Sequence, residues 1–273
     1  MLTTNDFINI FLPVLSHWIV WLSFVIVVII ILVIYAYPYL KKSRKEFLNY
    51  HIRIPIVCII ALYIFTKMLE GVIYNGSILN VDSWINGVMT ALKSQWLIKT
   101  ASIITNLGGG ISIYLLFIFA IGILLFKKRW RFALLSTVVF LSGALLEVSV
   151  KYLVHRTRPE NLIASGYSFP SGHAIMAIVF ASLLIYSFKD DFKNKVVKYV
   201  LIIAALSFFI AVAISRIILH VHWFSDVVAG MSLGLFWFMF VVLVERSITG
   251  VIKAVRVETK MAEPIVPREY YLI

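Results

Sequence analysis

Charged residues are scarce in this sequence. Aspartate, glutamate, lysine and arginine together make up 14% of the 273 residues, and 62% are hydrophobic; soluble domains carry about 25% charged residues. This shortage of charge excludes a soluble globular protein. The apolar residues lie in long runs, and about 20 helical residues cross a hydrocarbon core that is about 30 Å thick. The sequence therefore predicts an integral membrane protein.

Cysteine is nearly absent as well. Cys58 is the single one, so an intrachain disulfide is impossible, and its place in an apolar run indicates a packing role. A net charge of +12 raises the question of nucleic acid. However, the basic residues lie in short loops beside apolar runs rather than in a patch with interleaved aromatic rings. We therefore expect no nucleic-acid partner.

Seven apolar segments are predicted to be membrane helices, because backbone groups in lipid must be satisfied within the segment. The first has no basic residue before it and no small-residue cleavage site, so we expect a span rather than a signal peptide. The fold class is therefore an all-α polytopic membrane bundle. The segments run from Phe11 to Tyr37, Ile52 to Tyr74, Ser102 to Phe126, Phe132 to Val154, Pro170 to Phe188, Tyr199 to Leu219 and Trp223 to Val244.

Lysine and arginine are distributed unevenly between the two sides of these segments. Eighteen lie in one set of loops and in the C-terminal tail, and six lie in the opposite set. Because cytoplasmic loops carry the excess of basic residues, we expect the amino terminus outside and the carboxyl terminus inside. Three of the six outer cations, Lys151, Arg158 and Arg216, fall at the ends of segments. They predict an anion site that faces away from the cytoplasm.

The stretch from Val81 to Thr100 has apolar residues such as Trp84 at helical spacing, with Asp82 and Asn86 mostly opposite. Two interpretations fit it equally: an amphipathic helix in the outer interface, or a helix that packs on the bundle. Either helix would lie near the mouth of the anion site.

The stretch from Ser215 to Asp226 delivers a histidine and an aspartate to one end of the last segment. His222 and Asp226 are four residues apart, so on a helix the carboxylate can orient the imidazole. A histidine held in this way is a candidate nucleophile or base. For the pair alone, a structural role is favoured, in which the histidine caps a helix and the aspartate accepts a hydrogen bond from an N-terminal backbone amide.

The tetrapeptide from Pro170 to His173 opens the fifth segment. Pro170 suits the first turn of a helix. Ser171 and Gly172 leave a small, open helix N-terminus, where free amides and the helix dipole favour an anion. His173 lies beside this terminus and is placed to donate a proton.

Lys151 and Arg158 are seven residues apart and are expected to face the same opening, to which Arg216 adds a third cation. Arginine offers a planar fork for two phosphate oxygens, and lysine offers a compact charge. A single basic residue at a helix end usually anchors to lipid headgroups. Three cations, two histidines and one aspartate from four segments favour a phosphate site instead.

Together these residues resemble the three signature motifs of the type 2 phosphatidic acid phosphatase superfamily, which also holds lipid phosphate phosphatases and vanadium haloperoxidases. The resemblance covers about Val81 to Glu245, and it implies a six-helix phosphatase core to which the first segment is additional. The matching motifs are K-x6-RP (Lys151, Arg158, Pro159), PSGH (Pro170 to His173) and SR-x5-H-x3-D (Ser215, Arg216, His222, Asp226).

The resemblance implies a role for each residue. His222 would attack phosphorus and form a phosphohistidine, assisted by Asp226, and His173 would protonate the leaving oxygen. The three cations would take the charge-neutralising place that magnesium fills in many phosphoryl-transfer enzymes, so we expect no metal and no other cofactor. The phosphate would be held by Lys151, Arg158, Ser171, Gly172 and Arg216.

Several other residues have competing interpretations. His220 forms an HVH triplet with His222, but no third metal ligand is evident, so a structural role is favoured. Glu147 lies four residues before Lys151 and is expected to pair with it. Lys67 and Glu70 resemble an intramembrane pair without an assigned role. Gly108 to Gly110 could cradle a phosphate, although a tight turn or close helix packing is favoured.

The leading prediction is a metal-independent phosphatase that releases phosphate from a membrane lipid phosphate or diphosphate at the outer face of a bacterial cytoplasmic membrane, in phospholipid or cell-envelope metabolism. A lipid phosphotransferase and a non-catalytic lipid-phosphate-binding protein are the alternatives. The lipid itself stays open, and selectivity is expected in the stretches from Val81 to Thr100 and from Glu160 to Phe169. We divide the chain into an N-terminal helix with a basic loop (1–50), the phosphatase core (51–246) and a cytoplasmic tail (247–273).

Overall fold

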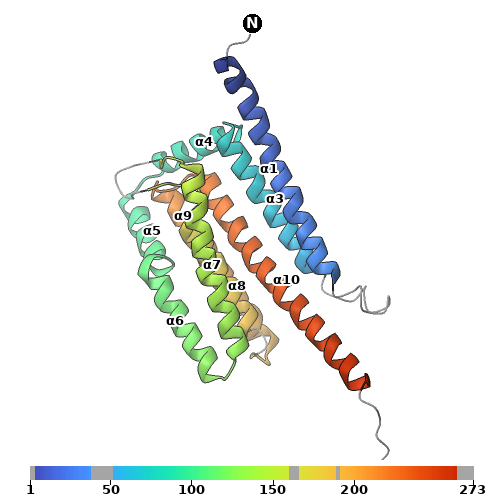
Figure 1. Cartoon of the computed structure of the whole chain (residues 1–273). Coiled ribbons are helices and arrows are strands. Elements are labelled where there is room, and N and C mark those ends of the chain that lie inside the picture. Colours follow the sequence, from blue (N-terminus) through green and yellow to red (C-terminus); the bar gives the residue numbers. More distant parts are fainter. Residues whose placement is uncertain (1–3, 38–51, 160–165, 189–190, 263–273) are drawn as a thin grey trace, which may run out of the picture.

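The computed structural model of the chain describes residues 4–37, 52–159, 166–188 and 191–262, and its regular elements within these ranges are α-helices (Figure 1). The all-α prediction is thereby confirmed. The helices are α1 (Thr4–Ala36), α3 (Arg53–Ile73), α4 (Ile78–Ala91), α5 (Gln95–Leu107), α6 (Gly110–Phe126), α7 (Trp130–Val154), α8 (Gly172–Phe188), α9 (Lys195–Ile218) and α10 (Phe224–Ala262).

Six helical stretches in the described part of the chain are long and apolar enough to cross a membrane, where the sequence predicts seven. The exception is α8, whose 17 residues extend about 25 Å at 1.5 Å per residue. Most of its side chains are buried against other helices. The helix begins at the polar PSGH motif and is packed inside the bundle, which explains its shorter apolar run.

The helix predicted from Val81 to Thr100 is instead two helices. α4 ends at Ala91, and α5 starts afresh at Gln95 because the Ser94 side chain accepts a hydrogen bond from the Leu97 amide at 3.2 Å. The α5 helix then continues through a break at Gly108 and Gly109 into α6, so this span begins earlier than the predicted Ser102. A serine N-cap thus overrides the continuous apolar periodicity.

Helix α10 lies against both α3 and α8 (Figure 1). It approaches α8 closely: a Cβ atom on Gly230 would lie 2.5 Å from the Ser171 carbonyl oxygen, and one on Gly234 would lie 2.5 Å from Ile178 Cγ2. These glycines let the two backbones meet beside the predicted PSGH motif. At its other end α10 continues to Ala262, past the predicted end at Val244.

The additional helix α1 packs along α3 through a polar cluster (Figure 1). The Glu70 carboxylate accepts hydrogen bonds from Lys67 Nζ at 2.6 Å and from Trp21 Nε1 at 3.0 Å, and His17 Nδ1 lies 3.2 Å away. The predicted Lys67–Glu70 pair is therefore confirmed. Its partners on α1 give it a role that the sequence left open, because they attach the first helix to the core.

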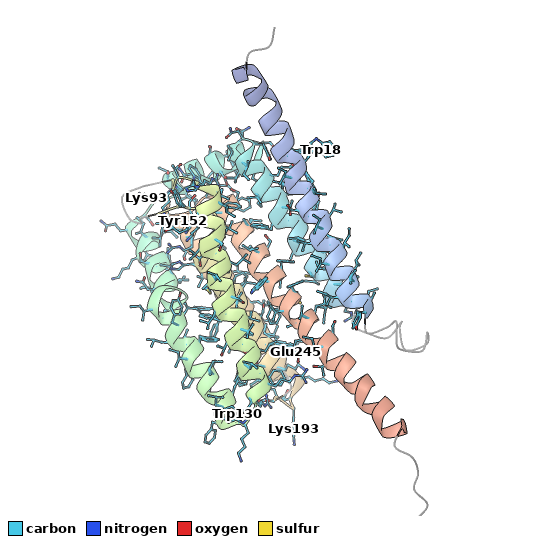
Figure 2. All side chains as sticks on the ribbon, in the orientation of Figure 1. Trp18, Lys93, Trp130, Tyr152, Lys193 and Glu245 are labelled. Carbon is cyan, nitrogen blue, oxygen red and sulfur yellow. The ribbon has the colours of Figure 1, made fainter. Side chains whose placement is uncertain are left out.

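The bundle has two ends with different polar groups. We call the end that holds Lys93 and Tyr152 the site end and the end that holds Trp130 and Lys193 the opposite end (Figure 2). Helices α7 and α9 finish at the site end, and α8 and α10 begin there. All three predicted motifs therefore meet at one end of the bundle.

Candidate active site

A cavity of about 420 Å³ opens at the site end. It brings together six of the eight predicted site residues, and the other two, Ser171 and Asp226, are fully buried and do not line it. The lining residues are Gly109, Gly110, Ile113, Tyr114, Glu147, Lys151, Arg158, Gly172, His173, Met176, Arg216 and His222.

His222 lies between α9 and α10, and its side chain is buried. Its Nε2 atom is 3.2 Å from Arg158 Nη1, and its Nδ1 atom is 3.5 Å from Asp226 Oδ2. Because a guanidinium can only donate hydrogen bonds, Nε2 is the acceptor, and the proton of the neutral ring therefore lies on Nδ1. Burial lowers the pKa of His222 to about 4, against the opposing effect of Asp226. The ring is consequently neutral near neutral pH, with a lone pair available on Nε2.

Asp226 does more than face His222. Its Oδ2 atom accepts a hydrogen bond from the Trp223 amide at 2.9 Å, as a cap of α10, and its Oδ1 atom accepts one from Arg156 Nη1 at 2.6 Å. Among the described residues, His222 Nδ1 has no hydrogen-bond partner, so its 3.5 Å contact with the carboxylate is electrostatic. The backbone contact expected of the aspartate in the structural role is present together with the contact that orients His222.

Arg156 is a residue that the sequence analysis missed as part of the site. Its Nη2 atom donates to Asp82 Oδ2 at 2.6 Å, and its guanidinium lies 5.4 Å from the centre of the Trp223 ring. Asp82 is buried and comes from α4. The segment after Val154 is not helical, so no periodicity indicated which of its two arginines, Arg156 or Arg158, would face the cavity.

Lys151 and Glu147 form the predicted pair, with 2.7 Å between Lys151 Nζ and Glu147 Oε1. The same carboxylate lies over the first residue of α8, because a Cβ atom on Gly172 would be 1.9 Å from Glu147 Oε1. Glycine is therefore required where this carboxylate meets the helix N-terminus. Glu147 occupies the cavity wall between a cation and the terminus that is expected to hold phosphate.

Arg216 and Arg158 are held in different ways. Arg216 is buried, its Nη1 atom donates to Thr105 Oγ1 on α5 at 2.7 Å, and its Nε atom has no partner among the described residues. Arg158 donates to the carbonyl oxygens of Val221 at 2.7 Å and Gly166 at 3.0 Å. Burial lowers the pKa of the Arg158 guanidinium, which Asp226 and Glu147 oppose. Thr105 is a second supporting residue that the sequence did not reveal.

The three glycines before α6 serve close packing and a turn, as favoured from the sequence. A Cβ atom on Gly108 would lie 2.1 Å from Val212 Cγ2, and one on Gly109 would lie 1.9 Å from His173 Cδ2. Gly110 has a φ of +55°, which favours glycine. Gly109 and Gly110 also line the cavity, so this turn places backbone directly against His173.

His220 faces away from the cavity. Its Nδ1 atom lies 2.7 Å from Asn86 Oδ1 on α4, which gives it the structural contact that the sequence favoured. Across the described residues, no group of three or more histidine, cysteine, aspartate or glutamate side chains is arranged to hold a metal ion.

Comparisons with known proteins identify the family of the chain. A family model described as the PAP2 superfamily matches residues 130–249, which contain all three motifs. Phosphatidylglycerophosphatase B of Bacillus subtilis (strain 168) is 31% identical over 188 residues, which make up 67% of this chain and 92% of that protein. The chain belongs to the PAP2 superfamily.

Two further relatives of this PAP2 protein are informative. An undecaprenyl-diphosphatase of Sulfolobus acidocaldarius is 30% identical over 143 residues, which cover 49% of this chain and 64% of that protein. The crystal structure of a transmembrane PAP2 type phosphatidylglycerolphosphate phosphatase from Bacillus subtilis superposes with a TM-score of 0.60 at 28% identity, over 70% of this chain and 96% of the other. The predicted family and enzyme class, a membrane lipid phosphate phosphatase, are confirmed.

Proposed function

We propose that this PAP2 protein hydrolyses a terminal phosphate from a membrane lipid phosphate or diphosphate, with His222 as the nucleophile. The observation that carries this proposal is the convergence of two histidines and three cations on one cavity at the site end. A phosphate monoester has a charge of about −1.5 to −2 near neutral pH. The three positive charges of Lys151, Arg158 and Arg216 can neutralise this negative charge.

In the first step, the Nε2 lone pair of His222 attacks phosphorus, and the bond from phosphorus to the lipid oxygen breaks. Burial and the neighbouring cations, Arg216 first among them, lower the pKa of His173 to about 3, and the negative charge of a bound phosphate offsets these cations, so His173 takes up its proton together with the substrate. His173, on the cavity wall, then gives this proton to the departing oxygen and becomes neutral imidazole. The positive charge that develops on His222 is stabilised by Asp226, whose Oδ2 atom faces Nδ1 at 3.5 Å. The products of this step are the lipid alcohol, or a lipid monophosphate from a diphosphate, and a phosphohistidine.

In the second step, water attacks the phosphorus atom of the phosphohistidine. His173 accepts the proton from this water, the phosphorus–nitrogen bond breaks, and the electron pair returns to Nε2. Phosphate leaves, and both histidines are restored to their starting protonation states. The cycle thus needs no external acid, base or metal ion.

The cavity also holds donors suited to the phosphoryl oxygens. Arg216 lines the cavity and Ser171 lies behind its lining, next to Gly172; Arg216 Nε and Ser171 Oγ are buried and have no hydrogen-bond partner within the described residues. A buried polar group without a partner costs about 1–3 kcal/mol, and phosphoryl oxygens would satisfy both groups. Lys151 would exchange its contact with Glu147 for one with the substrate. Stabilising charge that develops in the transition state is usually the largest single contribution to such catalysis.

The proposed orientation follows from the distribution of basic residues. The site end carries few lysines and arginines in its loops and the opposite end carries many, so the positive-inside rule supports a cavity on the outer side of the membrane. Labelling of a single engineered cysteine near Lys93 with a membrane-impermeant maleimide, in intact cells, tests this placement. If that cysteine reacts only after the cells are opened, the cavity faces the cytoplasm and the proposed orientation is wrong.

The decisive experiment measures phosphate release by purified protein in detergent. The panel contains phosphatidylglycerophosphate, first because of the 31% identical relative, and phosphatidic acid, undecaprenyl diphosphate and a lipid A phosphate. Turnover should require His222, and a phosphoenzyme should be trapped in the wild type but not in His222→Ala. Full phosphate release by His222→Ala would refute the mechanism. Phosphorylated acceptor in place of free phosphate would identify a phosphotransferase, and binding without turnover would identify a binding protein.

A further inference from the structure

A buried charge network joins helix α4 to the aspartate beside His222. Arg156 lies between two carboxylates, Asp82 and Asp226, at 2.6 Å from each. The Asp82 and Asp226 side chains are 1% and 0% exposed, and that of Arg156 is 10% exposed. Charges so thoroughly removed from water are stable only when they are paired and hydrogen-bonded. The three side chains therefore have one arrangement, and removing any one of them alters the other two.

Ser225 completes the network and fixes its geometry. Its amide donates to Asp82 Oδ1 at 2.8 Å, and its hydroxyl donates to Asp82 Oδ2 at 2.6 Å. The same hydroxyl oxygen accepts a hydrogen bond from Arg156 Nη1 at 2.7 Å. Asp82 thus receives three donors and is bound to the first turn of α10, directly beside Asp226. The Asp82 carboxylate thus links helix α4 to the catalytic end of α10.

The charge of the network determines what Asp226 can do. A guanidinium paired only with Asp226 would cancel most of the effect of that carboxylate on the His222 ring. Two carboxylates around one guanidinium leave a net charge of −1, so the negative potential at the imidazole persists. This balance is what a phosphohistidine mechanism needs, because the ring becomes positive during attack.

We infer that Asp82 and Arg156 are positioning residues for Asp226: Arg156 fixes the carboxylate, and Asp82 offsets the guanidinium charge so that Asp226 still acts on His222. This inference rests on the proposed role of His222 as the nucleophile. It assigns α4 a part in catalysis in addition to packing. The other charged or titratable side chains near His222 and Asp226 are Lys151, Arg158, Arg216, His173, Glu147 and His220.

The test compares four forms of the protein by the net charge of the three side chains. Wild type has −1, Asp82→Asn has 0, Arg156→Gln has −2, and the double variant returns to −1. Asp82→Asn should lower kcat about tenfold with KM changed by less than about twofold, because Asp82 does not line the cavity. Its acid limb in the pH profile of kcat/KM should move to lower pH by about half a unit, because a lost negative charge lowers the proton affinity of His222.

The double variant separates charge from position. Its acid limb should return close to that of the wild type, because the net charge is restored. Its kcat should stay low, because nothing then fixes Asp226 from the side of Arg156. The double variant leaves one buried carboxylate without its guanidinium, where Arg156→Gln leaves two, so it keeps the test decisive if Arg156→Gln fails to fold. An unrestored acid limb, or wild-type kcat in the double variant, would overturn the inference.

Asn86→Ala is the matched control. Asn86 lies one turn after Asp82 on α4 and holds the neighbouring His220 at 2.7 Å without carrying charge. If Asp82 only attaches α4, Asn86→Ala should reproduce the loss of kcat, and Asp82→Asn should leave the pH profile unchanged; that result would overturn the inference. Phosphatidylglycerophosphate in detergent micelles is the substrate. Phosphoenzyme in the wild type and its loss in His222→Ala establish the mechanism independently of the outcome at Asp82.

Discussion

The two ends of this bundle handle charge in opposite ways. At the opposite end, Lys127 and Arg129 both pair with Asp191, and their side chains are 43% and 32% exposed. At the site end, the carboxylates of Asp82 and Asp226 are almost fully buried beside Arg156. Exposed pairs contribute about 0–1 kcal/mol each, whereas removing one partner of a buried pair costs about 3–5 kcal/mol.

This difference separates ion pairs that connect helices from charges that are buried at the site end. Exposed ion pairs at the opposite end connect neighbouring helices and loops, and water can replace either partner. The buried cations at the site end cannot be replaced by water, so they stay in place between substrates. Four experiments test this contrast, starting with the largest expected effect.

Arg216→Ala should abolish most activity. It removes a buried cation from the cavity wall and the hydrogen bond to Thr105, and the loss of such an electrostatic group typically costs about 100-fold or more in kcat. Phosphate release measured with phosphatidylglycerophosphate checks this value. Arg216→Lys keeps the charge but not the planar fork and should recover only part of the rate. Wild-type activity in Arg216→Ala would show that this cation does not bind the phosphate.

Gly109→Ala should lower kcat about 10-fold to 100-fold, because a displacement of about 1 Å at a reacting group has effects of this size. The new Cβ atom would lie 1.9 Å from the His173 ring and would force it to move. Gly122→Ala, within helix α6 that follows Gly109, is the control, since nothing lies within 4 Å of its Cβ position. Equal activities of the two variants would show that His173 tolerates displacement.

Much of the site could be predicted from the sequence because its residues lie at helix ends. The four-residue spacing of His222 and Asp226, the PSGH tetrapeptide and Lys151 each fix a side chain relative to a helix terminus. The structure brings six of the eight predicted residues to one cavity. Local spacing was sufficient for these residues because a helix terminus has the same geometry wherever it occurs.

The remaining features depend on contacts that spacing does not encode. Asp82 and Asn86 belong to the polar face of α4, yet they point at Arg156 and His220, while Trp84 is 69% exposed. The polar face of α4 is thus the packed one. Its partners lie 74 and 134 residues away in the sequence, so local spacing could not predict this packing. Thr105 was missed for the same reason. A hydrophobic pattern predicts that one face of a helix is apolar and the other polar. Polar partners that are distant in the sequence decide which of the two faces is buried.

Acid should destabilise the two ends in different pH ranges. The buried His222 resists protonation until its pKa of about 4, while the unfolded chain takes up a proton near the ordinary value of 6.5, so stability falls as the pH drops from about 6.5 to about 4. Hydrogen bonding to Lys127 lowers the pKa of Asp191 from 3.8. The contribution of Asp191 to the free energy of unfolding is therefore complete above pH 3.8 and is lost only as the pH falls below that value.

Thermal unfolding of the detergent-solubilised protein at a series of pH values separates these contributions. His222→Asn should make the decline between about pH 6.5 and 4 shallower and leave the part that comes from His173, whose pKa burial lowers to about 3. Asp191→Asn should leave that decline unchanged. A decline in this range that is as steep in His222→Asn as in the wild type would mean that another group takes up the proton.

Arg131→Ala should have the smallest effect. Arg131 is 61% exposed, pairs with Glu245 across α7 and α10, and donates to Thr249 Oγ1 at 3.0 Å. An exposed pair of this kind contributes less than about 1 kcal/mol, and salt screens it further. Thermal unfolding should therefore shift by only a few degrees, and less in high salt, while phosphate release stays within about twofold of the wild type. A large loss of activity would mean that the opposite end is coupled to the cavity, and the contrast between the two ends would then fail.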